Sequence, residues 1–473
     1  HAVVPAGASA TEPAEEPAAH PSSGARRPLP MLGPTVRGGV GIARSGDRRI
    51  AFGGLVVGAT YLALALASLL LPPTIRLGAW LPVHLVLAGA ATTAIAAVLP
   101  FFTAALVVAP PAHPAIRMGG IGLVAAGALG VMSAYGHARG EALPALLGGG
   151  AFLAGLALVA VATFAPIRGA LGPRRVLFQR AYALALLNVA VGATIATLVV
   201  GGNEAVGAAW GSLKPTHAWL NLVGFAGLVI VTTLLHLAPT VAGTRLRPRV
   251  SGRLAVIGIA LGAPMVAAGY AGALDPLART GAISVLAGAI GVVAHGAVIH
   301  LDRDRGRWTT DVGWHRFTSL ALLTGAGWLG FGLAAAAARV LVSGANPAGW
   351  SLPVLVGPLV IGGVSGILVG ALTHLLPAIG PGDPIRHAAQ RRLLGRAAAV
   401  RIGALNAGAA LVTIGLGPAA VPGGGAPGGT LVAVGLACAA IGIGGSIGLL
   451  ALAARPGAST RFGAYAESAT GRG

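Results

Sequence analysis

A histidine, an asparagine and a glycine follow one another along an apolar segment near the middle of the chain. His217, Asn221 and Gly224 lie four and three residues apart, so in an α-helix they share one face. The surrounding run is long enough to cross a bilayer, and polar groups inside such a run are costly and usually functional. This face therefore offers an imidazole ligand, a polar neighbour and a small residue that leaves room beside them.

His84 has a similar place on the second apolar run, near the same side of the membrane. Ala88 and Ala91 follow on its helix face. Small residues beneath an imidazole leave space for a flat macrocycle, and histidines from two helices commonly hold haem. We therefore predict haem b between the second and sixth runs, bound through His84 and His217. The structural alternative stays open, because small residues also let helices pack closely and a histidine near a helix end also contacts lipid headgroups.

Other histidines lie near the opposite side of the membrane. His236 and His374 each stand three residues before a proline at the end of a run. Such a proline leaves the carbonyl four residues earlier, of Leu235 or Thr373, without its helical partner. A neighbouring side chain that satisfies this carbonyl would give the motif a structural role. The functional alternative is an inner metal site, for example for copper, formed by His236, His374 and His295.

The composition assigns the chain to the polytopic helical membrane proteins. Of the 473 residues, 55% are hydrophobic and 9% are charged, and the mean hydropathy is +0.82. The net charge of +20 would suggest nucleic acid in a soluble protein. Here the arginines lie between apolar runs and orient the chain in the lipid bilayer, so no nucleic acid partner is expected. The single cysteine, Cys438, excludes an internal disulfide, a thiolate metal cage and attachment of c-type haem.

Twelve apolar runs predict an all-α bundle of about twelve transmembrane helices within residues 50–454. Residues 1–49 lack a helical apolar period and are predicted to form a disordered cytoplasmic N-terminal tail, and residues 455–473 a cytoplasmic C-terminal tail. The runs lie at roughly 51–71, 81–109, 118–138, 144–166, 181–200, 216–243, 254–271, 281–301, 317–342, 352–380, 402–420 and 430–454.

The basic residues between the runs predict the orientation. With the N-terminus inside, 27 of the 32 lysines and arginines fall on the cytoplasmic side. The five outside are Arg76, Arg139, Lys214, Arg279 and Arg339. This asymmetry follows the positive-inside rule. We therefore expect both termini in the cytoplasm and a multi-pass protein of the plasma membrane.

The carboxylates are confined to the tails and connections. None of the twelve lies in the middle of a run, whereas ion-coupled transporters and proton pumps usually keep a buried Asp or Glu as a relay. Their placement argues against both classes. A transporter or scaffold with structural histidines nevertheless stays the alternative function, because helices broken by proline, as at Pro264, suit a transporter.

Taken together, these features resemble the haem-copper oxidase subunit I superfamily. The twelve spans with both termini inside, His84 in the second span, the spacing of His217 from Asn221, and the two His-Leu-x-Pro helix ends look like that family. The nearest likeness is to its divergent NnrS-like branch, of the actinobacterial type associated with copper oxidases or nitrite reductases. The resemblance covers most of residues 51–454. It implies an oxidase-like bundle, haem or copper binding, a redox partner, and a role in electron transfer or in nitric-oxide or metal stress.

The chain also departs from the family pattern. The seventh run has no histidine, and the tenth has only His374, at its inner end. In the resembled oxidases, histidines of these runs hold copper opposite a haem. The resemblance therefore implies no binuclear centre and no oxygen reduction for this chain.

Overall fold

The computed structural model describes residues 34–137, 140–170, 176–303, 310–380, 382–417 and 427–455. Every regular element in these ranges is helical, and twelve helices are long and apolar enough to cross a membrane. The prediction of an all-α polytopic membrane protein is therefore confirmed. The chain divides into two compact units, His1–Arg44 and Ser45–Gly473, and all twelve spans belong to the second.

The spans follow one another in chain order, and several contain a change of helix type. Spans 1 to 4 are α1 (Pro34–Ser68), α2 with η1 and α3 (Trp80–His84, Leu85–Ala91, Thr92–Val107), α4 (Pro114–His137), and α5 with η2 (Ala142–Phe164, Ala165–Gly169). Spans 5 to 8 are α6 (Val176–Val200), α8 with η3 and α9 (Trp210–Ala218, Trp219–Gly227, Leu228–Ala242), α10 (Val250–Ala271) and α11 (Asp275–Leu301). Spans 9 to 12 are α12 (Val312–Ser343), α13 with η6 and α14 (Pro353–Leu355, Val356–Ser365, Gly366–Ile379), α16 (Ala398–Gly415) and α17 (Pro427–Ala454).

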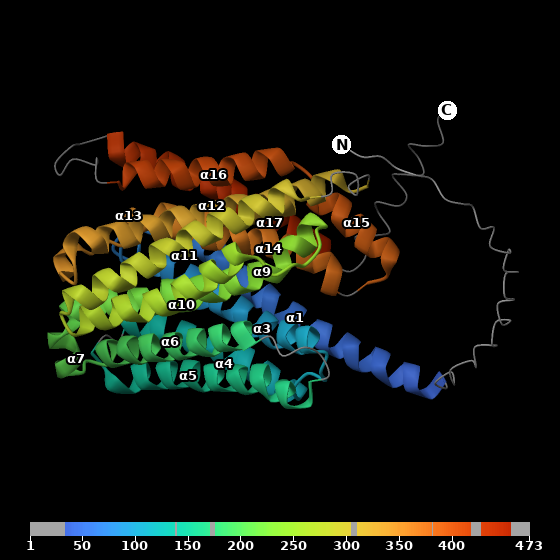
Figure 1. Cartoon of the computed structure of the whole chain (residues 1–473), viewed down its shortest axis with the longest axis horizontal. Helices are drawn as coiled ribbons and strands as arrows, with labels where there is room; N and C mark the ends of the chain where they lie inside the picture. Colours follow the sequence, from blue (N-terminus) through green and yellow to red (C-terminus); the bar gives the residue numbers. More distant parts are fainter. Residues whose placement is uncertain are drawn as a thin grey trace, which may run out of the picture. The chain divides into compact units, whose positions relative to one another are not determined.

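The connections between spans are short. Among the described residues, two of them contain a helix, α7 (Glu204–Ala208) before span 6 and α15 (Pro384–Leu394) after span 10, and Pro347–Gly349 forms a 3₁₀ turn before span 10. Figure 1 shows α7 and α15 at opposite ends of the spans. Chemistry must therefore be sought between the spans.

Helix α1 begins within the segment that was predicted as a tail. It starts at Pro34, although the spanning part begins at Gly46. Proline is accepted in the first turn of a helix, and no further proline interrupts the chain before the apolar residues. The helix of span 1 therefore extends into the predicted tail. Residues 1–33 and 456–473, which make up the rest of both predicted tails, lie outside the described residues.

Three pairs of consecutive spans pack most extensively against each other, and glycines make this approach possible. The pairs are α4 with α5, α10 with α11, and α16 with α17. A Cβ atom on Gly127 would lie 2.3 Å from the Phe152 nitrogen, and one on Gly258 would lie 2.6 Å from the Gly288 nitrogen. Small residues at such contacts let helix backbones come close in a membrane. These pairs are spans 3 and 4, spans 7 and 8, and spans 11 and 12, so the pairing recurs every four spans.

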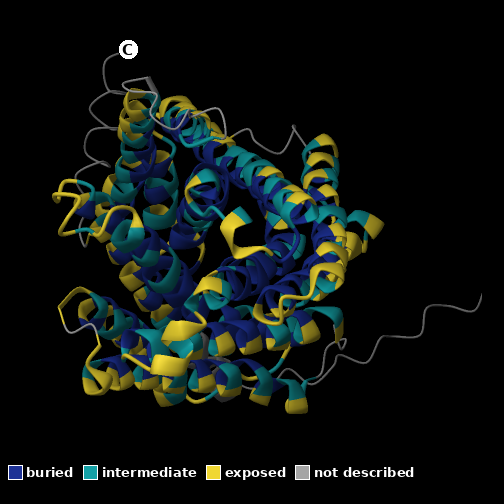
Figure 2. Ribbon diagram, turned by 90° about the vertical axis from the view of Figure 1, so that its left-hand side faces the viewer, coloured by how far each residue is buried: buried dark blue, intermediate teal, exposed yellow. Residues whose placement is uncertain are grey.

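Spans 2, 6 and 10 occupy the interior of the bundle and recur with the same interval of four. The buried share of these spans is 72%, 72% and 78%, against 33% to 56% for the other nine. Each of the three contains a π-helical segment, η1, η3 or η6. Figure 2 shows dark blue, buried residues on the inner helices and yellow, exposed ones on outward-facing parts. A π-helical segment inserts an extra residue per turn and is frequent at functional sites.

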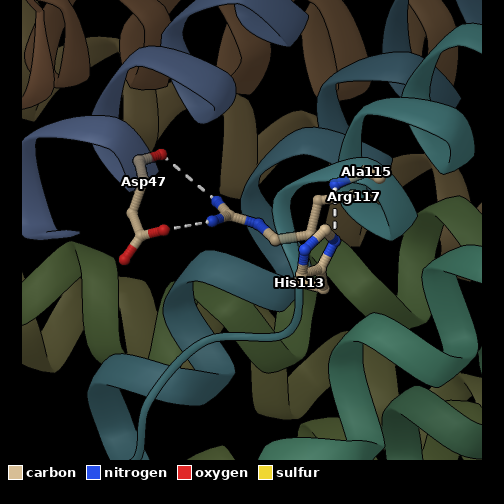
Figure 3. Close-up of polar contacts among 4 residues, drawn as sticks. All are labelled: Asp47, His113, Ala115 and Arg117. Carbon is tan, nitrogen blue, oxygen red and sulfur yellow. Dashed lines mark hydrogen bonds and ion pairs between the residues drawn. The ribbon is translucent and has the colours of Figure 1, made fainter.

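A buried ion pair joins spans 1 and 3 (Figure 3). Arg117, whose side chain is 1% exposed, donates to the Asp47 carboxylate at 2.7 Å and to the Asp47 carbonyl at 3.2 Å. At the start of the same helix, the His113 ring accepts a hydrogen bond from the Ala115 nitrogen at 3.3 Å. Such a pair is expensive to bury but strongly destabilising to break.

The carbonyl that Pro377 leaves without its helical donor finds a partner on span 9. Trp314 donates its indole N–H to the Thr373 carbonyl at 2.9 Å. The His374 ring stacks on the same indole, with ring centroids 5.2 Å apart. The Thr373 carbonyl is therefore satisfied by a neighbouring side chain, as the structural alternative predicts, and that side chain is an indole.

The arrangement of basic residues leads to a test of topology. We expect a reporter fused after Ser459 to be active in the cytoplasm and a reporter inserted within residues 201–213 to be active outside, because arginines accumulate on the inner side of the membrane. Paired phosphatase and fluorescent-protein fusions measure both positions. An external C-terminal reporter would contradict the N-in, C-in prediction.

Candidate functional site

A cavity lies among spans 2 to 6 and the approach to span 10. Its volume is about 280 Å³, close to the lower end of the roughly 300–1,000 Å³ that is usual for small-molecule sites. Apolar and aromatic side chains form most of its wall. The polar side chains that could address a ligand are few, and they include His84, His217 and Asn221.

The structure brings together the two outer histidines that the sequence indicates. His84 on α2 and His217 on α8 both line the cavity, and both are half-buried. Their ring centroids are 6.5 Å apart and their planes differ by only 18°. Residues 133 positions apart in the chain thus present two nearly parallel imidazoles to one space. His137, at the outer end of span 3, is exposed and takes no part in the lining.

Both rings are oriented through the same nitrogen. The Nδ1 atom of His84 is 2.7 Å from the Trp80 carbonyl oxygen, and the Nδ1 atom of His217 is 2.9 Å from the Gly192 carbonyl oxygen. A carbonyl only accepts, so each Nδ1 carries the hydrogen and donates it. The lone pair of a neutral imidazole is then on Nε2. Metal-ligating histidines are usually held in this way.

Asn221 supports the backbone of the helix that carries His217. Its Nδ2 atom donates to the His217 carbonyl at 2.8 Å and lies 3.0 Å from the His217 Nδ1. Because the Gly192 carbonyl can only accept, His217 Nδ1 carries its hydrogen, and its contact with the Asn221 nitrogen is then not a hydrogen bond. A Cβ atom on Gly192 would lie 2.4 Å from Asn221 Nδ2, so only glycine admits Asn221 here.

The π-helical segments shift the lining of the cavity by one residue from the α-helical expectation. Below His217 the wall contains Asn221 and Phe225, whereas Gly224 is buried away from it. A Cβ atom on Gly224 would lie 2.7 Å from Asn188 Nδ2, and Asn188 donates to the Gly224 carbonyl at 2.9 Å. Gly224 therefore makes room for a helix contact with span 5. The wider turn of η3 is the physical reason.

The same shift occurs in span 2. Below His84 the cavity is lined by Ala88, as predicted, and then by Thr92 instead of Ala91, which is buried. The Thr92 hydroxyl donates to the Leu87 carbonyl, five residues earlier, at 2.8 Å. This bond spans the π-helical turn and helps to hold the altered register.

Aromatic rings pack beside both histidines. Trp80 stacks on His84 with centroids 4.2 Å apart, and on its other side Tyr135 stacks at 4.1 Å. Trp210 lies 6.3 Å from His217. Tryptophan and tyrosine concentrate at membrane interfaces. Together with Asn188 and Gly192, these residues escaped prediction from the sequence. The sequence signal that could have found the latter two is a buried polar residue and a glycine four positions apart in span 5.

The inner histidines lie in three different surroundings. His236 packs against the Phe178 ring at 4.1 Å, and His374 stacks on Trp314. His295 is buried, lies 3.4 Å from the Ser251 hydroxyl, and lines a second, smaller cavity. Among the described residues, no group of three or more His, Cys, Asp or Glu side chains is placed to hold a metal ion. The predicted inner metal site thus gains no support from this arrangement.

No known protein-family model matches this chain, and no curated protein matches it. The functional interpretation therefore rests on the cavity and its side chains.

Proposed function

We propose that the outer cavity binds haem b through His84 and His217 and that the protein is an integral membrane haem protein of electron transfer or of nitric-oxide or metal stress. The observation that carries this proposal is the separation of the two rings. Two imidazoles bound to one metal at about 2.0–2.1 Å on opposite sides place their centroids roughly 6–6.5 Å apart. The measured centroid separation of 6.5 Å equals this value, and the stacked rings would have to turn so that both Nε2 atoms address one metal.

The donor set and the wall also suit haem. Haem ligands are often histidines, and the orientation of both Nδ1 atoms toward carbonyls leaves both Nε2 atoms as donors. The apolar and aromatic lining provides a low-polarity surround for a macrocycle. With Cys438 as the only cysteine, covalent attachment through a cysteine pair is excluded.

Each protein residue has a defined part in this proposal. His84 and His217 supply the two axial nitrogens. The carbonyls of Trp80 and Gly192 fix the ring orientation and raise the basicity of the ligating nitrogens. Asn221 holds the His217 turn in place. Haem with two imidazole ligands would supply one-electron chemistry. Of the functions proposed above, this chemistry favours electron transfer.

Kinship with the NnrS-like branch of the haem-copper oxidase subunit I superfamily is part of the same proposal. It is supported by the twelve spans, by His84 in span 2 and by the meeting of spans 2 and 6 at one cavity. A copper oxidase, a nitrite reductase or another redox protein in the plasma membrane would then be the partner.

The test is the absorption spectrum and metal content of the protein purified from haem-replete cells. We expect a Soret band, sharp bands on reduction, and iron in proportion to protein. If the purified protein contains copper but no haem, the metal bound by the same two histidines is copper instead of haem iron. A colourless protein without iron or copper would overturn the proposal and favour a transporter whose path includes the cavity.

We also expect no cyanide-sensitive oxygen consumption when the purified protein is supplied with an artificial electron donor. Span 7 (α10) contains no histidine, and the described residues hold no group of three metal-binding side chains. Oxygen uptake above that of haem-free protein, measured with an oxygen electrode and lost on His236→Ala or His374→Ala, would contradict this prediction.

A further inference from the structure

The cavity wall contains one charged side chain, Lys214, which is also the only lysine in the chain. It lies on α8, three residues before His217, and is exposed, whereas the two histidines are half-buried. Within the described part of the chain, the ion pairs involve other residues, and no hydrogen bond of its ammonium group occurs. The cation is therefore available at the open side of the cavity.

The surroundings of Lys214 are aromatic and apolar. Trp80, Trp210 and Trp350 line the same cavity, and Tyr135 extends the stack from Trp80. An anionic group turned toward this wall would lose its hydration without a partner, which is strongly unfavourable. Beside Lys214 it would gain an ion pair. The site thus selects a ligand with an apolar body and an anionic group at one end.

We propose that Lys214 binds a carboxylate of the ligand at the mouth of the cavity and so sets the orientation in which the ligand enters. This inference rests on the proposed function, because with haem b the carboxylate is a propionate. Lys214 is then a positioning residue, while His84 and His217 bind the metal. The propionate edge would face the outer side of the membrane, where Lys214 lies in the predicted topology.

The first arm of the experiment uses the uniqueness of this lysine. Haem-loaded and haem-stripped protein are treated with an amine-acetylating reagent, and the peptide that contains Lys214 is quantified by mass spectrometry. We expect several-fold slower acetylation in the loaded protein, because a paired and covered ammonium reacts less readily. Equal rates would contradict the proposal.

The second arm compares haem with haem dimethyl ester, which has the same body but no carboxylate charge. Wild-type protein should release the ester roughly fivefold faster than haem to a haem-scavenging acceptor protein, as expected for loss of an exposed ion pair. Lys214→Met should release both at the faster rate, and Lys214→Arg should restore the difference. Lys214 is exposed, so these variants should unfold at the wild-type temperature.

The outcomes separate this inference from the proposed function. If the wild type binds haem but Lys214→Met releases haem and ester as the wild type does, the role of Lys214 is overturned while haem binding stands. If the wild type binds neither compound, both proposals are overturned.

Discussion

Replacing either His84 or His217 by alanine is expected to abolish the stable Soret band of the purified protein. The two ring centroids are 6.5 Å apart, and each ring is the only histidine that its span contributes to the cavity wall. Loss of an outer-shell partner alone costs roughly 10- to 100-fold in metal affinity, so loss of a ligand should cost more. Haem content, measured as the pyridine haemochrome, should fall to the level of haem-free protein.

The matched control is His137→Ala. This histidine also lies at the end of a span but is exposed and does not line the cavity, so haem content should be unchanged. The double variant lacking His84 and His217 should lose no more haem than either single variant, because the two ligands act as a unit. Colour that survives both single changes would show that other residues bind the haem.

Removing the Asp47 carboxylate is expected to destabilise the protein by about 3–5 kcal/mol, because it leaves the charge of Arg117 buried without a counter-charge, with the backbone carbonyl of residue 47 still accepting one hydrogen bond from it. The Arg117 side chain is 1% exposed and that of Asp47 is 17% exposed. Asp47→Ala should therefore lower the unfolding temperature in detergent sharply. The double variant Asp47→Ala with Arg117→Met should recover much of the loss, since both charges are gone and the methionine can pack.

The control for this prediction is an exposed ion pair at the inner side. Asp302 pairs with Arg249, and its side chain is 49% exposed. Asp302→Ala should cost no more than about 1 kcal/mol, the usual value for surface pairs. Equal destabilisation by Asp47→Ala and Asp302→Ala, measured by thermal unfolding, would show that burial does not decide the strength of the Arg117 pair.

Some features of the fold and of the site are local properties of the chain and could be predicted. The length of each apolar run is set by the thickness of the hydrocarbon layer, so twelve runs indicate twelve spans. The depth of each histidine follows from its position within its run. His84 and His217 could therefore be predicted to lie near the same side of the membrane before any contact was known, and imidazole is a side chain that can bind a metal.

The register of the cavity wall was out of reach of the same reasoning. An α-helical period places Ala91 and Gly224 beneath the two histidines. In the structure, the π-helical segments η1 and η3 place Thr92 and Phe225 on the cavity wall instead. The π-helical turns are accompanied by specific contacts that the apolar pattern does not reveal. In span 2 one such contact is the bond from the Thr92 hydroxyl to the Leu87 carbonyl. In span 6 the contact is with Asn188 of span 5, which holds the Gly224 carbonyl.

By itself, the sequence determined the class of the protein, the number of its spans, and the depth and chemical type of its histidines, because each depends on one segment and the bilayer around it. Only the tertiary structure decided which histidines meet. All apolar runs are equally acceptable neighbours in lipid, so pairing is selected by close backbone contact, as at Gly192, and by hydrogen bonds such as that from His217 to its carbonyl. In the structure His84 and His217 come together at one cavity, whereas among the described residues His236, His295 and His374 form no common group.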